Sequence, residues 1–202
     1  LGSKDTPPSS IFALFKELEK DQPKERFTLG ITDDVTGLSL PEVKPAPITA
    51  AAGTKECKFW GLGGDGTVGA NKNSVKIIGD HTDKYVQAYF QYDSKKTGGV
   101  TISHLRFGDK PIRSPYYINQ ADFVACHNPA YIHMGMKMVQ DVKPGGVFMI
   151  NCQWSDEELG QHLNAEAKKY IADNNIQLYT INAIDKAIEI GMGKRTNTIL
   201  QS

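Results

Sequence analysis

The sequence predicts an α/β fold: an open, mostly parallel sheet with helices on both faces (Rossmann-like), preceded by an N-terminal helix and an extended connector. From Glu56 onward, short apolar stretches of strand length alternate with helical stretches, which is the pattern of β-α-β units. The chain has 202 residues, 40% of them hydrophobic, so it can bury one substantial core. It contains no internal repeat and no low-complexity tract.

The first fifty residues differ in composition from the rest. Apolar residues at helical spacing behind a serine cap predict an amphipathic helix that "KDQPK" ends; they are Ile11, Phe12, Phe15 and Leu18, with Ser9 or Ser10 as the cap. A short strand-like "RFTLGI" follows, and then "TDDVTGLSLPEVKPAPITAAAGTKE", whose prolines and turn-forming residues favour an extended connector. We therefore expect a boundary near residues 50–54, with 1–50 as helix and connector and 51–202 as the α/β domain.

The elements expected in residues 51–202 follow in order. Strands are predicted at "CKFWGL", "YVQAYFQYD", "GGVTISHLRFG", "ADFVACH", "VFMINC" and "IQLYTIN". Helices are predicted at "GANKNSVKIIGDH", "YIHMGMKMVQDV", "SDEELGQHLNAEAKKYIADN" and "AIDKAIEIGM". Ser155 and Glu158 have the spacing of a capping box at the start of the third helix.

Composition and charge exclude several classes of function. Basic and acidic residues balance at 23 each, so a global basic field for nucleic acid is absent. No run of 18 apolar residues and no signal-like N-terminal stretch is present, which argues against membrane insertion and secretion. Cys57, Cys126 and Cys152 lie in apolar runs without a CxxC pair, so we expect buried thiols in a reducing, cytoplasmic compartment and neither an iron–sulfur cluster nor a structural zinc.

A glycine-rich loop follows the first strand of the domain. In "CKFWGLGGDGTVGANKNSVKII", the spacing Gly61-x-Gly63-x-x-Gly66 matches the dinucleotide fingerprint, between a predicted strand and a predicted helix. Glycines let backbone N–H groups approach an anion at the positive end of a helix. The loop predicts an anion site, against the alternative of a tight turn without a ligand, and does not by itself choose the molecule.

Residues near the glycine loop and after the next predicted strand indicate which phosphate compound the loop could bind. Asp93 could hold the ribose hydroxyls of a dinucleotide, but Lys95 and Lys96 suit an additional phosphate, as in NADP or the 3′-phosphate of coenzyme A. Asp65 would repel a pyrophosphate, so its side chain is expected to cap the next helix or to face away.

Long motifs over essentially the whole chain resemble one family. The segments "GLGGDGTVGANKNSVKIIGD" and "YFQYDSKKTGGVTISHLRFGDKPIRSPYYINQADFVACHNP" look like the gamma-type domain of pyruvate:ferredoxin (flavodoxin) oxidoreductase. Upstream, "SKDTPPSSIFALFKEL" and "FTLGITDDVTGLSLP" resemble the connecting segment before that domain in the long single-chain form. "GMGKRTNTILQS" resembles its C-terminal boundary.

The resemblance implies a domain of a larger enzyme. That enzyme would oxidatively decarboxylate pyruvate on thiamine diphosphate with Mg²⁺, pass electrons through [4Fe-4S] clusters to ferredoxin or flavodoxin, and form acetyl-coenzyme A, as a homodimer. Here Gly64-Asp65-Gly66 and Asn71 are too closely spaced for the thiamine diphosphate motif. We expect those cofactors on other domains, an isolated chain that is inactive, and no nucleic-acid or membrane partner.

The role implied for this domain is to line the substrate pocket and help to bind coenzyme A. The glycine loop would lie at the mouth of the pocket, with lysines on the phosphates. The candidate cofactor-binding residues are Gly63, Gly64, Gly66, Thr67, Asn71, Lys72, Lys95, Lys96 and Arg106. No catalytic residue and no metal ligand is expected. Lys95 and Lys96 could instead form a solvated turn, and Arg106 could pair with a carboxylate of a neighbouring domain.

Other polar and apolar residues have structural interpretations. His104 is more typical of a hydrogen-bonded packing residue than of a catalyst. His127 follows a buried strand at its carboxyl end, where open α/β sheets place ligands, and a capping or positioning role is expected. Met134, Met136 and Met138 are interpreted as packing or interface residues rather than a metal site.

Two alternatives come from other classes of function. The first is a free-standing Rossmann-type protein that binds NADP, supported by the fingerprint and Asp93 but lacking a Tyr-x-x-x-Lys pair. The second is a purely structural assembly domain, whose apolar and tyrosine-rich surfaces, such as "SPYYINQ", bury against sister domains.

Overall fold

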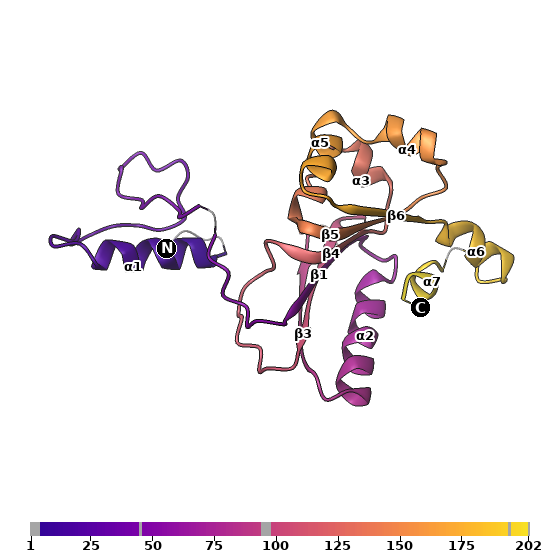
Figure 1. The fold of residues 1–202 in the computed structure, drawn as a ribbon, viewed down its shortest axis with the longest axis horizontal. Helices are drawn as coiled ribbons and strands as arrows, with labels where there is room; N and C mark the ends of the chain where they lie inside the picture. Colours follow the sequence, from indigo (N-terminus) through magenta and orange to yellow (C-terminus); the bar gives the residue numbers. More distant parts are fainter. Residues whose placement is uncertain (1–4, 45, 94–97, 194, 202) are drawn as a thin grey trace. The chain divides into compact units, whose positions relative to one another are not determined.

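The computed structural model describes residues 5–44, 46–93, 98–193 and 195–201. The chain forms two compact units, residues 1–51 with 113–117 and residues 52–112 with 118–202 (Figure 1). No helix in the described ranges is long and apolar enough to cross a membrane.

The first unit is built around one helix and a small core. Helix α1 (Pro8–Leu18) confirms the predicted helix, but the cap is Pro7, and Ser9 and Ser10 lie buried in the first turn. The predicted cap is therefore wrong, because Pro8 at the first helical position starts the helix earlier. The strand expected at "RFTLGI" is reduced to a single bridge between Thr28 and Ser39. The core cluster consists of Ala13, Leu29 and Leu40, with Leu14, Phe27 and Val43 packed against it.

The second unit is an open sheet of six strands in the order β2-β3-β1-β4-β5-β6. Its strands are β1 (Lys55–Leu62), β2 (Tyr85–Tyr92), β3 (Val100–Gly108), β4 (Ala121–Cys126), β5 (Val142–Asn151) and β6 (Gln177–Ile181). The pairs β1–β4, β4–β5 and β5–β6 are parallel, whereas β2–β3 and β1–β3 are antiparallel. The predicted α/β class is confirmed, with a mixed sheet. The connection from β2 to β3 is too short for a parallel crossover, so these two strands form a hairpin.

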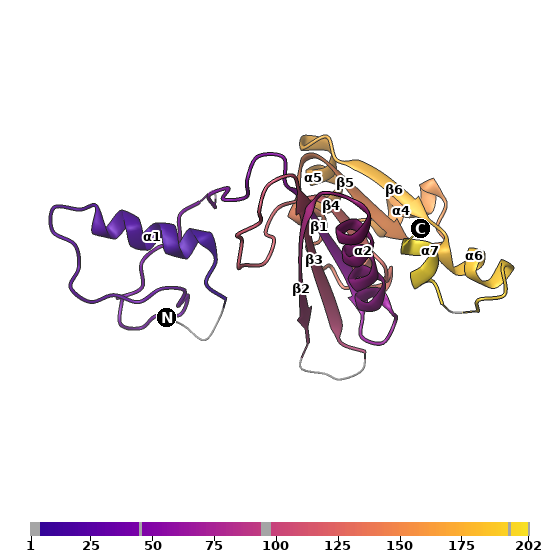
Figure 2. The ribbon, with the colours of Figure 1, turned by 90° about the horizontal axis from the view of Figure 1, so that it is seen from below.

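Helices cover both faces of this sheet (Figures 1 and 2). Helix α2 (Thr67–His81) packs against β1, β2 and β3 on one face. The other face carries the main core, under α3 (Ala130–His133), the 3-10 helix η1 (Val139–Asp141), α4 (Asp156–His162) and α5 (Ala165–Asp173). Helices α6 (Ala183–Glu189) and α7 (Asn197–Gln201) follow β6.

Two predicted helices are interrupted. The helix expected at "YIHMGMKMVQDV" is only α3 and η1, because Gly135 turns the chain with a φ of 68° and Val142 already begins β5. The helix expected at residues 155–174 is split into α4 and α5, since the Asn164 side chain accepts from the N–H of Ala167 and starts a second helix.

The structure also shows the predicted capping box and the positions of the methionine series. The capping box at the start of α4 is formed, because Ser155 and Glu158 each accept a hydrogen bond from the other's backbone N–H. Of the methionine series, Met138 is fully buried in the core, Met136 is partly buried and Met134 is 68% exposed.

Candidate functional site

The sheet has one topological switch point, between β1 and β4. The chain leaves the carboxyl end of β1 into α2 on one face and leaves the neighbouring parallel strand β4 towards α3 on the opposite face. Open α/β sheets bind ligands in the crevice outside the carboxyl ends of two such strands. The glycine loop that follows β1 and the residues that follow β4 therefore meet at the edge where a ligand is expected.

Asp65 organises the glycine loop from within. One carboxylate oxygen accepts the N–H of Thr67 at 2.7 Å, and the other accepts the N–H of Leu62 at 2.8 Å and the Thr67 hydroxyl at 2.9 Å. Thr67 is the first residue of α2, so the carboxylate also lies at the positive end of that helix. Of the two orientations expected for Asp65, the observed one is contact with the start of α2, from the position just before the N-cap residue Gly66.

His127 closes the same hydrogen-bonded chain from β4. Its Nδ1 lies 2.9 Å from the Thr67 hydroxyl oxygen, and burial lowers the pKa of the imidazole to about 4. Because the Thr67 hydroxyl donates its single proton to Asp65, Nδ1–H of a neutral His127 must donate to Thr67. Nε2 is then left as an acceptor, buried and with no hydrogen-bond partner among the described residues.

Close packing explains why Gly61, near the end of β1, is a glycine. The Tyr131 hydroxyl donates to the carbonyl oxygen of Gly61 at 2.9 Å from the core side. On the other side, a Cβ at Gly61 would lie 2.5 Å from the Thr67 hydroxyl oxygen. Only glycine therefore allows β1 and the first turn of α2 to approach this closely.

The remaining loop amides differ in how they are used. The N–H of Gly63 donates to Gly99 at 2.7 Å and Gly98 donates back to Gly63, so the β2–β3 connection touches the loop. Gly64 and Gly66 have φ values of 95° and 89°, and their N–H groups find no acceptor in the described part of the chain. These two amides could therefore donate to an anion, Gly64 at an exposed position and Gly66 beside the Asn197 side chain of α7.

The other candidate residues are placed differently. Asn71 lies one turn after Thr67 on α2, is 4% exposed, and its Nδ2 has no hydrogen-bond partner among the described residues. Lys72 is exposed, with its ammonium 5.3 Å from the centre of the Phe90 ring on β2. Lys95 and Lys96 lie outside the described residues.

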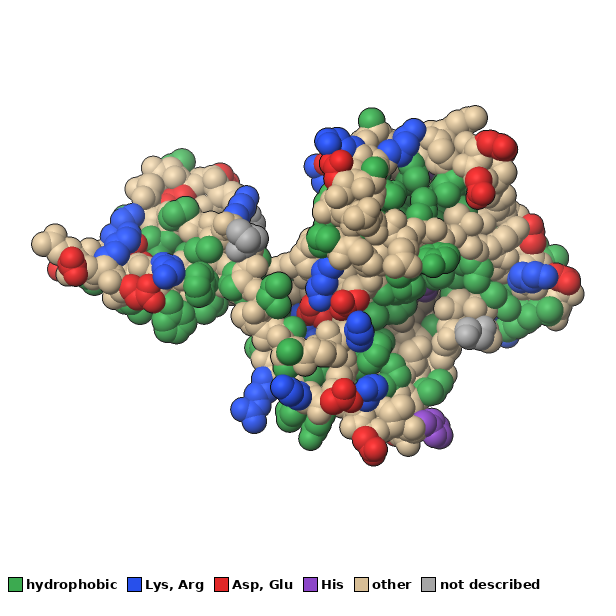
Figure 3. Space-filling view, viewed as in Figure 1, with side chains coloured by type: hydrophobic (Ala, Val, Ile, Leu, Met, Phe, Trp, Pro, Cys, Tyr) green, Lys and Arg blue, Asp and Glu red, His purple; other side chains and the backbone are tan. Residues whose placement is uncertain are grey.

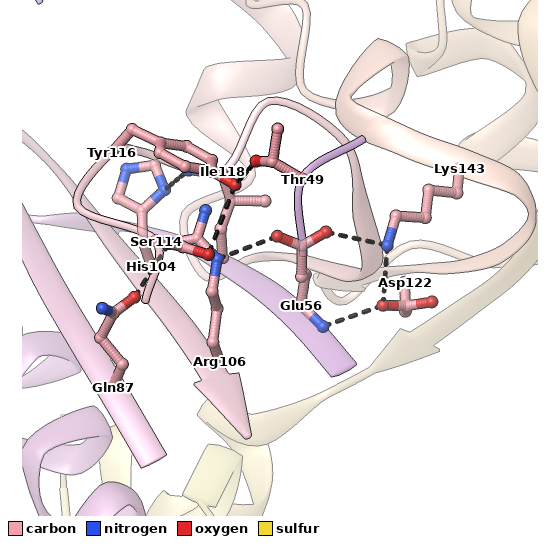
Figure 4. A network of polar contacts seen from close by, with 10 residues as sticks. All are labelled: Thr49, Glu56, Gln87, His104, Arg106, Ser114, Tyr116, Ile118, Asp122 and Lys143. Atoms are coloured by element: carbon pink, nitrogen blue, oxygen red, sulfur yellow. Dashed lines mark hydrogen bonds and ion pairs between the residues drawn. The ribbon is translucent and has the colours of Figure 1, made fainter. Parts of the chain in front are cut away.

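Arg106 belongs to a buried charge network (Figure 4). Its Nε donates to Glu56 at 2.9 Å and its NH1 to Gln87 at 3.1 Å, while Lys143 bridges Glu56 and Asp122. Arg106 pairs with Glu56 at the amino end of β1, whereas the glycine loop follows its carboxyl end. At about 3.3 Å per residue the two lie about 20 Å apart, so the structure does not bring Arg106 to the loop.

The three cysteines have the chemistry of packing residues. Burial raises the pKa of Cys57 and of Cys126 to about 12, and it raises the pKa of Cys152 as well. At neutral pH these thiols stay protonated and are poor nucleophiles. Within the described ranges no three His, Cys, Asp or Glu side chains are grouped so that they could hold a metal ion.

The sequence predicted the glycine loop but not the contacts that His127 and Tyr131 make with it. Thr67 and His127 are 60 residues apart, so no local pattern could show their contact. Tyr131 was assigned to a long helix, although its position just after β4 is a signal that it could reach β1.

Comparison with known proteins agrees with this architecture. The family model "Pyruvate ferredoxin/flavodoxin oxidoreductase" matches residues 56–202. The whole chain is 55% identical to pyruvate:ferredoxin oxidoreductase of Moorella thermoacetica. The chain belongs to the pyruvate ferredoxin/flavodoxin oxidoreductase family. It spans 17% of the length of the first curated relatives it matches.

Two solved structures share the fold. A pyruvate oxidoreductase subunit PORC from Thermotoga maritima is 19% identical, with a TM-score of 0.58 over 74% of this chain and 73% of that chain. A 2-oxoglutarate:ferredoxin oxidoreductase from Magnetococcus marinus, solved with 2-oxoglutarate, coenzyme A and succinyl-CoA bound, is 15% identical, with a TM-score of 0.55 over 74% of this chain and 23% of that chain.

Proposed function

We propose that residues 51–202 are the gamma-type domain, and residues 1–50 the connecting segment, of an enzyme that oxidatively decarboxylates pyruvate to acetyl-coenzyme A. Membership of the family and identity along the whole chain to a pyruvate:ferredoxin oxidoreductase support this proposal. The enzyme would be a cytoplasmic homodimer that passes electrons to ferredoxin or flavodoxin. Thiamine diphosphate, Mg²⁺ and [4Fe-4S] clusters would supply the decarboxylation and electron transfer from other domains.

We infer that this domain contributes to the binding of coenzyme A at the glycine loop. The observation that carries this inference is the pair of N–H groups of Gly64 and Gly66, which find no acceptor among the described residues, at the switch point beside the amino end of α2. The Asp65 carboxylate accepts three hydrogen bonds inside the loop, and these offset part of its repulsion of an incoming phosphate. Lys95 and Lys96 lie within three residues of Gly98, which hydrogen-bonds the loop, and would supply cations for the phosphates.

The chain's own residues would position coenzyme A and exclude water. The loop is already ordered by Asp65, Thr67 and His127, so binding an anion there requires little further ordering. None of these groups is placed to transfer electrons, and the buried thiols do not suit cluster ligation. Proton and electron chemistry is therefore assigned to the other domains.

The test is steady-state kinetics of the full-length enzyme with Lys95→Ala and Lys96→Ala combined. We expect the KM for coenzyme A to rise about tenfold, equivalent to about 1.4 kcal/mol, because two phosphate-binding cations are lost. Reduction of the enzyme by pyruvate without coenzyme A should be nearly unchanged. The matched control is Lys168→Ala with Lys169→Ala, an exposed adjacent pair on α5. An unchanged KM, or an equal rise in the control, would remove Lys95 and Lys96 from the site.

A further inference from the structure

Asn151, the last residue of β5, is a buried amide that uses both of its ends. It is 2% exposed. Its Nδ2 donates to the carbonyl oxygen of His127 at 3.0 Å, and its Oδ1 accepts the N–H of Ala183, the first residue of α6, at 3.1 Å. One end must donate and the other must accept, so an amide fits this position and a carboxylate or an aliphatic side chain does not. Asn151 therefore joins the end of β5 to the residue after β4 and to the start of α6.

The contact with Asn151 fixes the main chain of His127. Strand β4 ends at Cys126, whose register partner on β5 is Ile150. The N–H of His127 still donates to the carbonyl oxygen of Trp60 on β1 at 2.9 Å. Its carbonyl oxygen lies beyond the ladder with β5, and Asn151 supplies the donor that a buried carbonyl group requires. The main chain of His127 is thus held from both neighbouring strands.

The imidazole ring of His127 depends on this placement of its main chain. Nδ1 lies 2.9 Å from the Thr67 hydroxyl oxygen, whereas Nε2 has no hydrogen-bond partner among the described residues. The ring also meets the Phe59 ring edge-on, with 6.0 Å between the ring centres. Only one ring nitrogen is anchored, so a shift of the main chain would move Nδ1 out of line with Thr67. Hydrogen bonds weaken steeply when they are misaligned.

This chain of hydrogen bonds ends inside the glycine loop. The Thr67 hydroxyl donates to the Asp65 carboxylate, which also accepts the N–H groups of Leu62 and Thr67. We call Asn151, His127, Thr67 and Asp65 the loop support. Thr67 is 1% and His127 8% exposed, and Figure 3 shows hydrophobic side chains gathered on the surface between β6 and α2. Water therefore competes little for these bonds, which strengthens them.

We propose that Asn151 is a positioning residue for anion binding at the glycine loop. It holds His127, which reaches the loop through Thr67. The loop held in this way presents the N–H groups of Gly64 and Gly66 to the anion. Asn151 acts at a distance, because β5 lies two strand spacings, about 9.6 Å, from β1. This inference rests on the proposed function, in which the anion is a phosphate of coenzyme A.

The test is steady-state kinetics of the full-length enzyme with Asn151→Ala. We expect the KM for coenzyme A to rise about fivefold, the effect of losing one hydrogen bond, while reduction by pyruvate without coenzyme A stays nearly unchanged. The matched control is Asn182→Ala, which removes the N-cap contact to the Asp185 N–H and so loosens the start of α6 without touching His127. An unchanged KM for Asn151→Ala, or an equal rise in the control, would overturn the proposal.

A second pair of variants tests the loop support even where Asn151→Ala does not fold. Thr67→Val keeps the shape of the side chain but removes the hydroxyl, and it should raise the KM for coenzyme A about fivefold. Thr67→Ser keeps the hydroxyl and should restore most of this loss. Equal KM values for the valine and serine variants would overturn the proposal.

A double variant tests whether the two positions act through the same bonds. Asn151→Ala combined with Thr67→Val should raise the KM for coenzyme A no further than either change alone, because each breaks the same chain of contacts. Multiplied effects in the double variant would overturn the proposal. The combined Lys95→Ala and Lys96→Ala variant, measured in parallel, reports separately on the proposed function. A raised KM there, with an unchanged KM for Asn151→Ala, would overturn only the role of Asn151.

Discussion

At the scale of single residues, surroundings decide what a charged side chain does. Arg106 is 1% exposed, and its guanidinium binds Glu56 and Gln87 in the sheet. His104 is similarly enclosed: its Nδ1 accepts the N–H of Ile118 at 3.1 Å, and burial lowers its pKa to about 3. The expectation of a hydrogen-bonded packing role for His104 is confirmed. No contact of Arg106 with the described residues tests the expected role in binding coenzyme A, and its pairing with Glu56 at the amino end of β1 favours a structural role instead.

Replacing Arg106 tests whether it serves stability or binding. Arg106→Met leaves the buried Glu56 carboxylate with Lys143 as its remaining partner, and we expect the free energy of unfolding to fall by about 3 kcal/mol. Urea unfolding of the chain measures this change. In the full-length enzyme the KM for coenzyme A should stay unchanged, since Arg106 lies at the far end of β1 from the loop.

The control for that prediction is an exposed ion pair. Lys186→Met removes the partner of Glu189 at the surface, where both side chains are 65% exposed, and should lower the free energy of unfolding far less than Arg106→Met does. Equal effects of the two variants would show that the network around Arg106 contributes no more than a surface pair. A raised KM for Arg106→Met would return this residue to the binding site.

At the scale of elements, the arrangement of β1, the glycine loop and α2 requires the end of the strand and the first turn of the helix to pack closely together. Asp65 ties the end of the strand to the first turn of the helix, and His127 and Tyr131 support the loop from β4 and α3. The fingerprint spacing predicted the strand, the loop and the helix in the right order. It could not predict these supports, because they come from elements far along the chain.

A glycine substitution measures this close approach. Gly61→Ala would place a Cβ 2.5 Å from the Thr67 hydroxyl oxygen, so we expect destabilisation of about 2 kcal/mol in urea unfolding. Gly160→Ala is the matched control, because it lies inside α4 with nothing within 4 Å of the added Cβ. This control should stabilise the chain by about 0.5 to 1 kcal/mol through helix propensity. Destabilisation in both variants alike would contradict the packing argument.

At the scale of the whole second unit, strand order distinguishes this sheet from a dinucleotide-binding one. In the dinucleotide fold the acid that holds the ribose ends the strand next to β1. Here β3 lies between β1 and β2, so Asp93 at the end of β2 is two strand spacings, about 9.6 Å, from the strand that carries the glycine loop. The strand order therefore disfavours the alternative of a free-standing NADP-binding protein.

The buried histidines predict how the stability of the molecule depends on pH. Burial lowers the pKa of His104 to about 3 and of His127 to about 4, from an ordinary value of 6.5. Between these values the unfolded chain binds more protons than the folded one, so the free energy of unfolding should fall as pH drops from about 6.5 to 4. At about 1.4 kcal/mol per pKa unit, the loss is on the order of 3 kcal/mol for His127 and 5 kcal/mol for His104 once the pH falls below both pKa values of each group.

Urea unfolding at pH 7.5, 6 and 5 checks this dependence. His127→Asn should reduce the loss of stability on acidification relative to the unaltered chain, because it removes one of the two buried imidazoles. An equal pH dependence in the variant and in the unaltered chain would exclude His127 as a contributor.

The sequence by itself determined the α/β class, the capping box, the glycine loop and the family. These features depend on residues close together in the chain, or on long sequence motifs that can be recognised without knowledge of tertiary contacts. It also predicted that the Asp65 side chain caps the next helix or faces away, because a carboxylate pointing at a pyrophosphate would repel it, and the first of these two orientations is the one observed.

Only the tertiary structure decided the strand order, the partner of Arg106, and the link from Asp65 through Thr67 to His127. Each depends on which elements meet, and that is a balance of packing over the whole unit rather than a local preference. The partners are tens of residues apart in sequence, as with Arg106 and Glu56 or Thr67 and His127. Chain separation of that size leaves no periodicity from which a contact could be predicted.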